Sequence, residues 1–252
     1  NNIYATGGNS ITAYSQDTGE EVWYNPGTDS EPLWGPPSIA LGTVMVVSGY
    51  QLPYGEYTGN LIGFDANTGK QIWSYGNIYC TRPGDKFLPP LVLTNGLVVV
   101  QRYFGQGGQY ILFIDPRDGS LKKQVQLSNT YPLPAQIGNQ LIFLGGGGAT
   151  TIDISTFEVG NIANISFASD AGLVSPAVAT ENWLLMSASI TPNTGILNAY
   201  SLPEGTNTDG YPTWELKNND YLTIANIAPT IADNIVVFIV EVDNAQYLAA
   251  LD

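Results

Sequence analysis

Three cationic side chains that could bind an anion stand within a short stretch of this sequence. Arg82, Lys86 and Arg102 are three of only eight basic residues in a chain that carries 22 acidic ones. Guanidinium and ammonium groups that converge on one point hold an anion through charge-assisted hydrogen bonds. The sequence therefore offers these three residues as a candidate anion-binding site.

A thiol and a carboxylate accompany these cations. Cys80 is the single cysteine of the chain and stands two residues before Arg82. Neighbouring cations favour the thiolate form of a cysteine, which is a nucleophile, and Asp85 would then be the general acid or base. In the alternative interpretation Cys80 is a small buried apolar residue, as free cysteines usually are, and the cations only solvate a loop. The residue types favour this second interpretation.

The composition argues against several other kinds of site. There is no histidine and no second cysteine, so we expect no structural zinc, no attached haem, no metal and no cofactor. The formal charge of −14 at pH 7 would repel the phosphates of nucleic acid. We find no apolar run long enough to cross a bilayer, and we expect no membrane insertion.

The same composition bears on where the protein works. Near pH 2 most carboxylates are neutral, so only eight cationic side chains would repel one another in the folded state. This suits an acidic environment, but it also suits an ordinary secreted surface. Asn164 opens an Asn-Ile-Ser sequon, which makes it a candidate glycosylation site of an exported protein. We therefore expect an extracellular or periplasmic location.

A repeat with a period of roughly 40–50 residues, the range of propeller blades, runs through the chain. The segment from Ala13 to Trp23 aligns with the segment from Gly63 to Trp73, and fainter copies follow. The anchor residues of the six copies are Ser15, Asp65, Asp115, Asp153, Ser201 and Asp252. In each close copy an apolar strand ends at the anchor, a Thr-Gly turn follows, and a second strand carries the tryptophan.

Two further strands are predicted before each anchor. A proline opens a short apolar strand, as in Pro37–Ala40, where its missing N–H is tolerated. A strand that is apolar on both faces follows, as in Val44–Val47. Each complete repeat is thus four strands, a to d, and such blades around an axis make an all-β propeller. We expect one domain over residues 1–252, with four complete blades between a first blade of strands b, c and d and a last blade of strands a, b and c.

The Ala-x-Asp-x-x-Thr-Gly-x-x-x-Trp pattern of these copies resembles the blade motif of the pyrroloquinoline-quinone-like (PQQ-like) propellers. The resemblance implies a fold more than an activity, because the family includes quinone dehydrogenases, outer-membrane assembly lipoproteins, secreted binding proteins and acidophile hydrolases. Its quinone dehydrogenases use a calcium site, a tryptophan floor and commonly a vicinal cysteine pair. This sequence contains no Cys-Cys pair.

Three functions remain open. The first is a non-catalytic exported propeller that binds, assembles or builds a larger structure; further blades or another chain would cover its incomplete first and last blades, so we expect an oligomer or a larger assembly. The second is an acid-stable extracellular hydrolase of the tetrathionate hydrolase type. The third is a fragment of a quinone-dependent dehydrogenase. In each case we expect the site on long loops at 49–59, 75–87 and 101–108, on one side of blades 2 and 3.

Overall fold

The computed structural model describes most of the chain as strands and short turns. The described residues are 1–27, 32–51, 57–80, 89–104, 108–128, 134–145, 148–162, 173–174, 178–180, 183–191, 194–201, 214–217, 223–224, 229–232, 235–242 and 245–251. They form 24 strands and no helix, and accordingly no helix in these ranges could span a membrane. The chain divides into two compact units, Asn1–Thr130 and Tyr131–Asp252.

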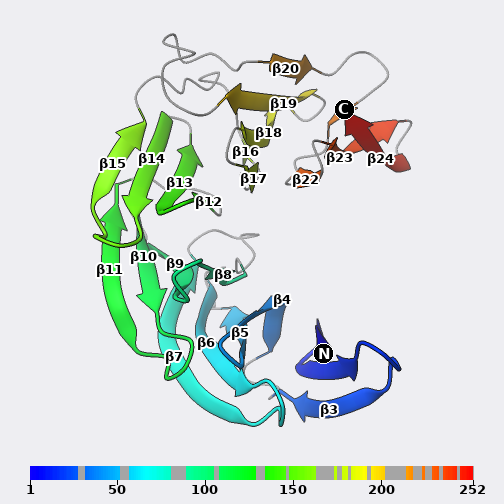
Figure 1. The fold of residues 1–252 in the computed structure, drawn as a ribbon, viewed down its shortest axis with the longest axis vertical. Coiled ribbons are helices and arrows are strands. Elements are labelled where there is room, and N and C mark those ends of the chain that lie inside the picture. The colour runs from blue at the N-terminus through cyan, green and yellow to red at the C-terminus, as the bar shows by residue number, and fades with distance from the viewer. Residues whose placement is uncertain are drawn as a thin grey trace. The chain divides into compact units, whose positions relative to one another are not determined.

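The first unit contains three antiparallel sheets (Figure 1). Sheet 1 is β1 (Asn2–Gly7), β2 (Ser10–Ser15) and β3 (Glu21–Pro26). Sheet 2 is β4 (Leu33–Ala40), β5 (Thr43–Gln51), β6 (Tyr57–Asp65) and β7 (Gln71–Cys80). Sheet 3 is β8 (Leu91–Val92), β9 (Val98–Phe104), β10 (Gly108–Ile114) and β11 (Leu121–Leu127). Neighbouring strands of each sheet follow one another in the chain, as in a propeller blade.

The second unit also contains three sheets. Sheet 4 is β12 (Ala135–Ile137), β13 (Gln140–Gly145), β14 (Gly148–Asp153) and β15 (Val159–Ile162). Sheet 5 is β16 (Leu173–Val174), β17 (Val178–Ala179), β18 (Trp183–Thr191), β19 (Thr194–Ser201) and β20 (Trp214–Lys217). Sheet 6 is β21 (Thr223–Ile224), β22 (Thr230–Ala232), β23 (Ile235–Val242) and β24 (Ala245–Leu251).

The predicted all-β fold of four-stranded propeller blades is confirmed, and so is the three-stranded first blade. Two details differ from the prediction. In sheets 5 and 6 strand a is divided into two short pieces, each of which pairs with strand b. The strands on the expected site side are also longer than predicted, so that Cys80 and Arg102 lie in strands and not in loops. Tyrosine and threonine at Tyr50, Tyr57 and Thr58 suit pleated strands, and the β5–β6 pairing continues through them.

The turn after each anchor is held by the anchor itself. The amide of Gly69 donates to the carbonyl oxygen of Asp65 at 2.9 Å, and the Asp65 carboxylate accepts from the amide and the hydroxyl of Thr68, both at 2.8 Å. Gly69 adopts a φ of 67°, which favours glycine because a Cβ meets the following carbonyl oxygen there. Asp65, Thr68 and Gly69 therefore each stabilise this turn.

A tryptophan joins each of the first two sheets to the turn of the next. The indole Nε1 of Trp23 donates to the carbonyl oxygen of Ala66 at 3.0 Å, and that of Trp73 donates to Pro116 at 2.8 Å. Each indole also packs on the turn glycine: a Cβ built on Gly69 would lie 2.5 Å from the Trp23 ring. We call this paired contact, with the hydrogen bond and the glycine together, the indole latch.

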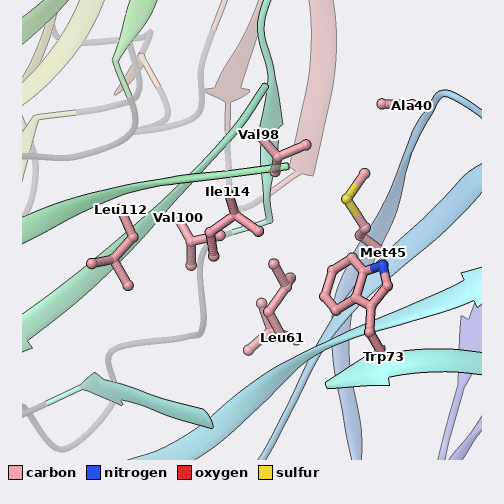
Figure 2. Close-up of a cluster of buried hydrophobic side chains, with 9 residues drawn as sticks. Ala40, Met45, Leu61, Trp73, Val98, Val100, Leu112 and Ile114 are labelled. Carbon is pink, nitrogen blue, oxygen red and sulfur yellow. The ribbon is translucent and has the colours of Figure 1, made fainter. Parts of the chain in front are cut away.

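An apolar cluster that includes Trp73 lies between sheets 2 and 3 (Figure 2). Its buried members are Ala40, Met45, Val47, Leu61 and Trp73 from sheet 2 and Val98, Val100, Leu112 and Ile114 from sheet 3. An equivalent cluster lies between sheets 1 and 2 and contains Trp23. Each pair of sheets in the first unit is therefore joined by burial of apolar surface, and the latch fixes their register.

Glycine-to-alanine substitutions measure the latch. Gly19, Gly69 and Gly119 adopt similar φ values of 71°, 67° and 70°, but only the last two contact an indole, and nothing lies within 4 Å of a Cβ at Gly19. Gly19→Ala should cost about 1 kcal/mol of backbone strain. Gly69→Ala and Gly119→Ala should each cost about 1–3 kcal/mol more, because the indole must move. Urea unfolding checks this; equal losses at all three positions would show that the latch contributes no stability.

Candidate functional site

The structure describes only part of the predicted anion site. Arg82, Asp85 and Lys86 lie outside the described residues, and so does the candidate glycosylation site Asn164. Cys80 is the last residue of β7, where it lies opposite Tyr57 of β6. The convergence of these groups therefore stays a prediction. The structure gives the backbone position of Cys80, at the end of β7.

Arg102 is the described member of this set, and it lies on β9 opposite Tyr110 of β10. The central carbon of its guanidinium lies 5.9 Å from the centroid of the Tyr110 ring, within the range of a cation–π interaction. Its Nε atom is buried and has no hydrogen-bond partner among the residues that the structure describes. A buried donor without a partner is unfavourable, so a ligand that offers a hydrogen-bond acceptor to the Nε atom of Arg102 would be stabilised there.

The position of Arg102 follows from the strand period. Side chains alternate between the two faces of a strand, so Arg102 shares its face with Val98 and Val100, which pack toward sheet 2. The register in sheet 2 places the Gly49–Gly59 pair one step beyond the Val47–Leu61 pair. Two glycines without side chains thus stand at the level that Arg102 occupies in sheet 3.

Tyr110 was not identified from the sequence. The alternation of side chains along a strand shows which face of sheet 3 carries Tyr110, but only when the pairing register of β9 and β10 is known. That register depends on a hairpin whose length the sequence did not predict. The signal that could have found it is the alternation of Tyr110, Leu112 and Ile114, the last two of which belong to the cluster between sheets 2 and 3.

Asp115, which the sequence predicted as the anchor of the third repeat, has a structural role. Asp115, the anchor of sheet 3, is buried and accepts hydrogen bonds from Nε and Nη2 of Arg117 at 2.9 and 2.7 Å, with Nζ of Lys122 at 3.4 Å. The Arg117 hydrogen bond holds the pKa of Asp115 well below its usual range. Hydrogen bonds within their own turns also lower the pKa of Asp65, through Thr68, and of Asp153, through the amides of Thr156 and Ser155. These carboxylates therefore stabilise their turns in the ionised form.

The described residues do not fit a quinone site of the kind that the family resemblance implies. Within the described ranges, no three His, Cys, Asp or Glu side chains gather where they could hold a metal ion. Trp23 and Trp73 cannot serve as a quinone floor while their rings pack on Gly69 and Gly119 and their Nε1 atoms donate to the turns. We therefore derive no step through a quinone.

Comparisons with known proteins agree on the fold. Residues 1–185 match a family model described as outer membrane protein assembly factor BamB. BamB from Moraxella catarrhalis is 14% identical, with a TM-score of 0.53 over 99% of this chain and 82% of that one. A europium-containing methanol dehydrogenase is also 14% identical, with a TM-score of 0.52 over 99% and 67%. Hsv2 from Kluyveromyces lactis is 9% identical, with a TM-score of 0.63 over 100% and 82%. A search of curated protein sequences finds no match.

Stability should depend on pH through the anchor aspartates. Their pKa values are depressed in the folded state, so their contribution is present above the unfolded pKa of about 4 and is lost as pH falls through the folded values. The free energy of unfolding should therefore stay level from pH 7 to about 5 and fall below about pH 4.

Asp115→Asn is the variant that isolates this effect. It should cost roughly 2 kcal/mol at pH 7, because it removes the charge that Arg117 binds, and should reduce the loss in acid. Asp17→Asn, in the equivalent turn of sheet 1, is the matched control. Urea titrations between pH 3 and 7 check the prediction, and an Asp115→Asn profile parallel to the wild type would contradict it.

Proposed function

The chain belongs to the family of the outer membrane protein assembly factor BamB, and from this membership we propose that it is an exported β-propeller that binds or assembles other proteins outside the cytoplasm. The observation that carries the proposal is the match over residues 1–185, which contain the close copies of the repeat. The acidic, histidine-free composition suits an extracellular or periplasmic location, and its charge of −14 argues against nucleic acid as a partner.

The outer strands of the first unit supply a surface for such binding. Among the described strands, β3, β7 and β11 each pair on one side only, so their other edges present N–H and C=O groups. An extended segment of another protein can add to such an edge as a further strand. Lysines commonly protect exposed edges, and β11 carries Lys122 and Lys123, whereas β7 carries no charged residue over its length of ten residues. The edge of β7 is therefore the preferred binding edge.

A labelled peptide with alternating apolar and polar residues, the pattern of outer-membrane strands, tests this function. It should bind the chain saturably in fluorescence anisotropy, and the same peptide with N-methylated amides should not, because it cannot complete the ladder. Ile72→Lys on the exposed part of β7 should weaken binding, whereas Leu41→Lys, in an exposed turn, should not. Equal binding by both peptides, or equal binding by both variants, would refute the proposal.

A second candidate function rests on Arg102. The buried Nε atom of Arg102, which has no hydrogen-bond partner among the described residues, supports an anion site that Arg82 and Lys86 would complete. The corresponding function is the acid-stable extracellular hydrolase of the tetrathionate hydrolase type. In this hydrolase Cys80 would be the nucleophile and Asp85 the general acid or base. Cys80→Ser would then abolish turnover without loss of the fold.

Calorimetry with tetrathionate and with sulfate decides whether this site exists. Arg102→Gln should remove binding, while Lys123→Gln, which removes the same charge from an exposed position, should leave it intact. Binding should be stronger at pH 4 than at pH 7, because protonation of neighbouring carboxylates such as Asp85 leaves the cations less neutralised. Identical titrations of the two variants would eliminate the anion site and, with it, the hydrolase.

A further inference from the structure

One peptide bond in the anchor turn of sheet 3 is chemically unlike its counterpart in sheet 2. Pro116 follows the anchor Asp115, whereas Ala66 follows the anchor Asp65, and this is the single Asp-Pro step of the sequence. Bonds between aspartate and proline are labile in acid. The aspartate carboxylate can attack its own main-chain carbonyl carbon, and the nitrogen of a tertiary proline amide is a more basic and therefore better leaving group. The chain thus contains the groups needed to cut itself here.

The reaction at this bond needs only a proton and water. A carboxylate oxygen of Asp115 forms a bond to the Asp115 carbonyl carbon, the bond from that carbon to the nitrogen of Pro116 breaks, and the nitrogen takes a proton from solvent. A cyclic anhydride remains at residue 115. Water then adds to the anhydride and opens it, which restores the aspartate side chain and gives it a new α-carboxyl group. The products are the chains 1–115 and 116–252.

The nucleophile of this reaction is bound in the folded turn. The Asp115 side chain is only 4% exposed. Its Oδ1 accepts hydrogen bonds from Nε and the amide of Arg117 at 2.9 and 3.0 Å, and its Oδ2 accepts from Nη2 at 2.7 Å. Nζ of Lys122 lies 3.4 Å from Oδ2, and Asp118 also interacts with this carboxylate electrostatically. A carboxylate bound in this way is a weak nucleophile, because attack must first break charge-assisted hydrogen bonds.

These bonds persist in moderate acid. The Arg117 hydrogen bond holds the pKa of Asp115 well below its usual range, so the carboxylate stays ionised, and stays bound, at a pH where a free aspartate is largely protonated.

The leaving group is held as well. Pro116 is buried, and its carbonyl oxygen accepts a hydrogen bond from Nε1 of Trp73 at 2.8 Å, the contact of the indole latch. The amide of Gly119 donates to the carbonyl oxygen of Asp115 at 2.9 Å and fixes the scissile carbonyl group in the turn. Solvent must deliver a proton to the buried proline nitrogen, so cleavage requires the turn to open.

We propose that the Asp115–Pro116 bond is a self-cleavage site that the folded turn keeps intact, with Arg117 as the residue that restrains the nucleophile. In acid the native chain is then cut at the rate of the open turn multiplied by the fraction of time that the turn is open. The cut removes the covalent link between β10 and β11. This inference concerns the lifetime of the chain in acid and does not depend on the binding function proposed above.

Cleavage of the whole chain at about pH 3, followed by mass spectrometry of the fragments 1–115 and 116–252, tests the proposal. The native wild type should be cut at least about tenfold more slowly than the same chain unfolded in urea at that pH, since the turn must open first. Arg117→Gln should be cut several-fold faster than the wild type. Lys123→Gln, which removes an exposed cation of the same sheet, should be cut at the wild-type rate.

Two controls separate local opening from general loss of stability and from other acid chemistry. Gly69→Ala destabilises the turn of sheet 2 and leaves Arg117 in place, so it should be cut more slowly than Arg117→Gln. Pro116→Ala, which copies Ala66, should not be cut after residue 115 in the native or the unfolded chain.

Four results would overturn the proposal. These are an unfolded wild type that stays intact, equal rates for the native and the unfolded wild type, including through loss of the fold at this pH, an Arg117→Gln rate equal to that of the wild type, and an acceleration by Gly69→Ala as large as that by Arg117→Gln. Peptide binding at β7 is measured separately, so either proposal can fail alone.

Discussion

The indole latch is the contact on which the arrangement of the first unit depends. An indole that both donates to a turn carbonyl and lies on a turn glycine fixes the distance and the register between two sheets at once. Three features of the sequence then follow from it. The turn must end in glycine, its anchor must hold the turn closed, and the residue opposite the tryptophan must be small, as Ala13 and Gly63 are.

The third repeat departs from this pattern, because it has no tryptophan. At the position of the tryptophan it has Lys123, and opposite stands Phe113 in place of a small residue. The next turn correspondingly has Phe157 where the others have glycine, and it adopts a φ of 62°. A bulky residue in this conformation is costly, which fits a turn that no longer needs to receive an indole. The three changes occur together, since each removes one requirement of the latch.

How much the sequence predicted depends on how local each feature is. The repeat, its strands and its turns were predictable because apolar alternation and an Asp-Thr-Gly turn are set by neighbours in the chain. The ends of the hairpins were not, because the β5–β6 and β9–β10 ladders extend through polar and glycine-rich residues whose pairing depends on the partner strand. Arg102 was therefore placed in a loop. Its contact with Tyr110 and the glycine pair facing its level could be recognised only once the registers were known.

The latch also determines how stability is distributed along the chain. Each indole contacts the turn of the next sheet, so the latch couples each of these repeats to its immediate neighbour. A molecule coupled in this way is a one-dimensional array, in which folding free energy is a sum of repeat terms and junction terms. At Lys123 the third repeat has no indole, so the latch contributes to the junction between sheets 1 and 2 and to the junction between sheets 2 and 3.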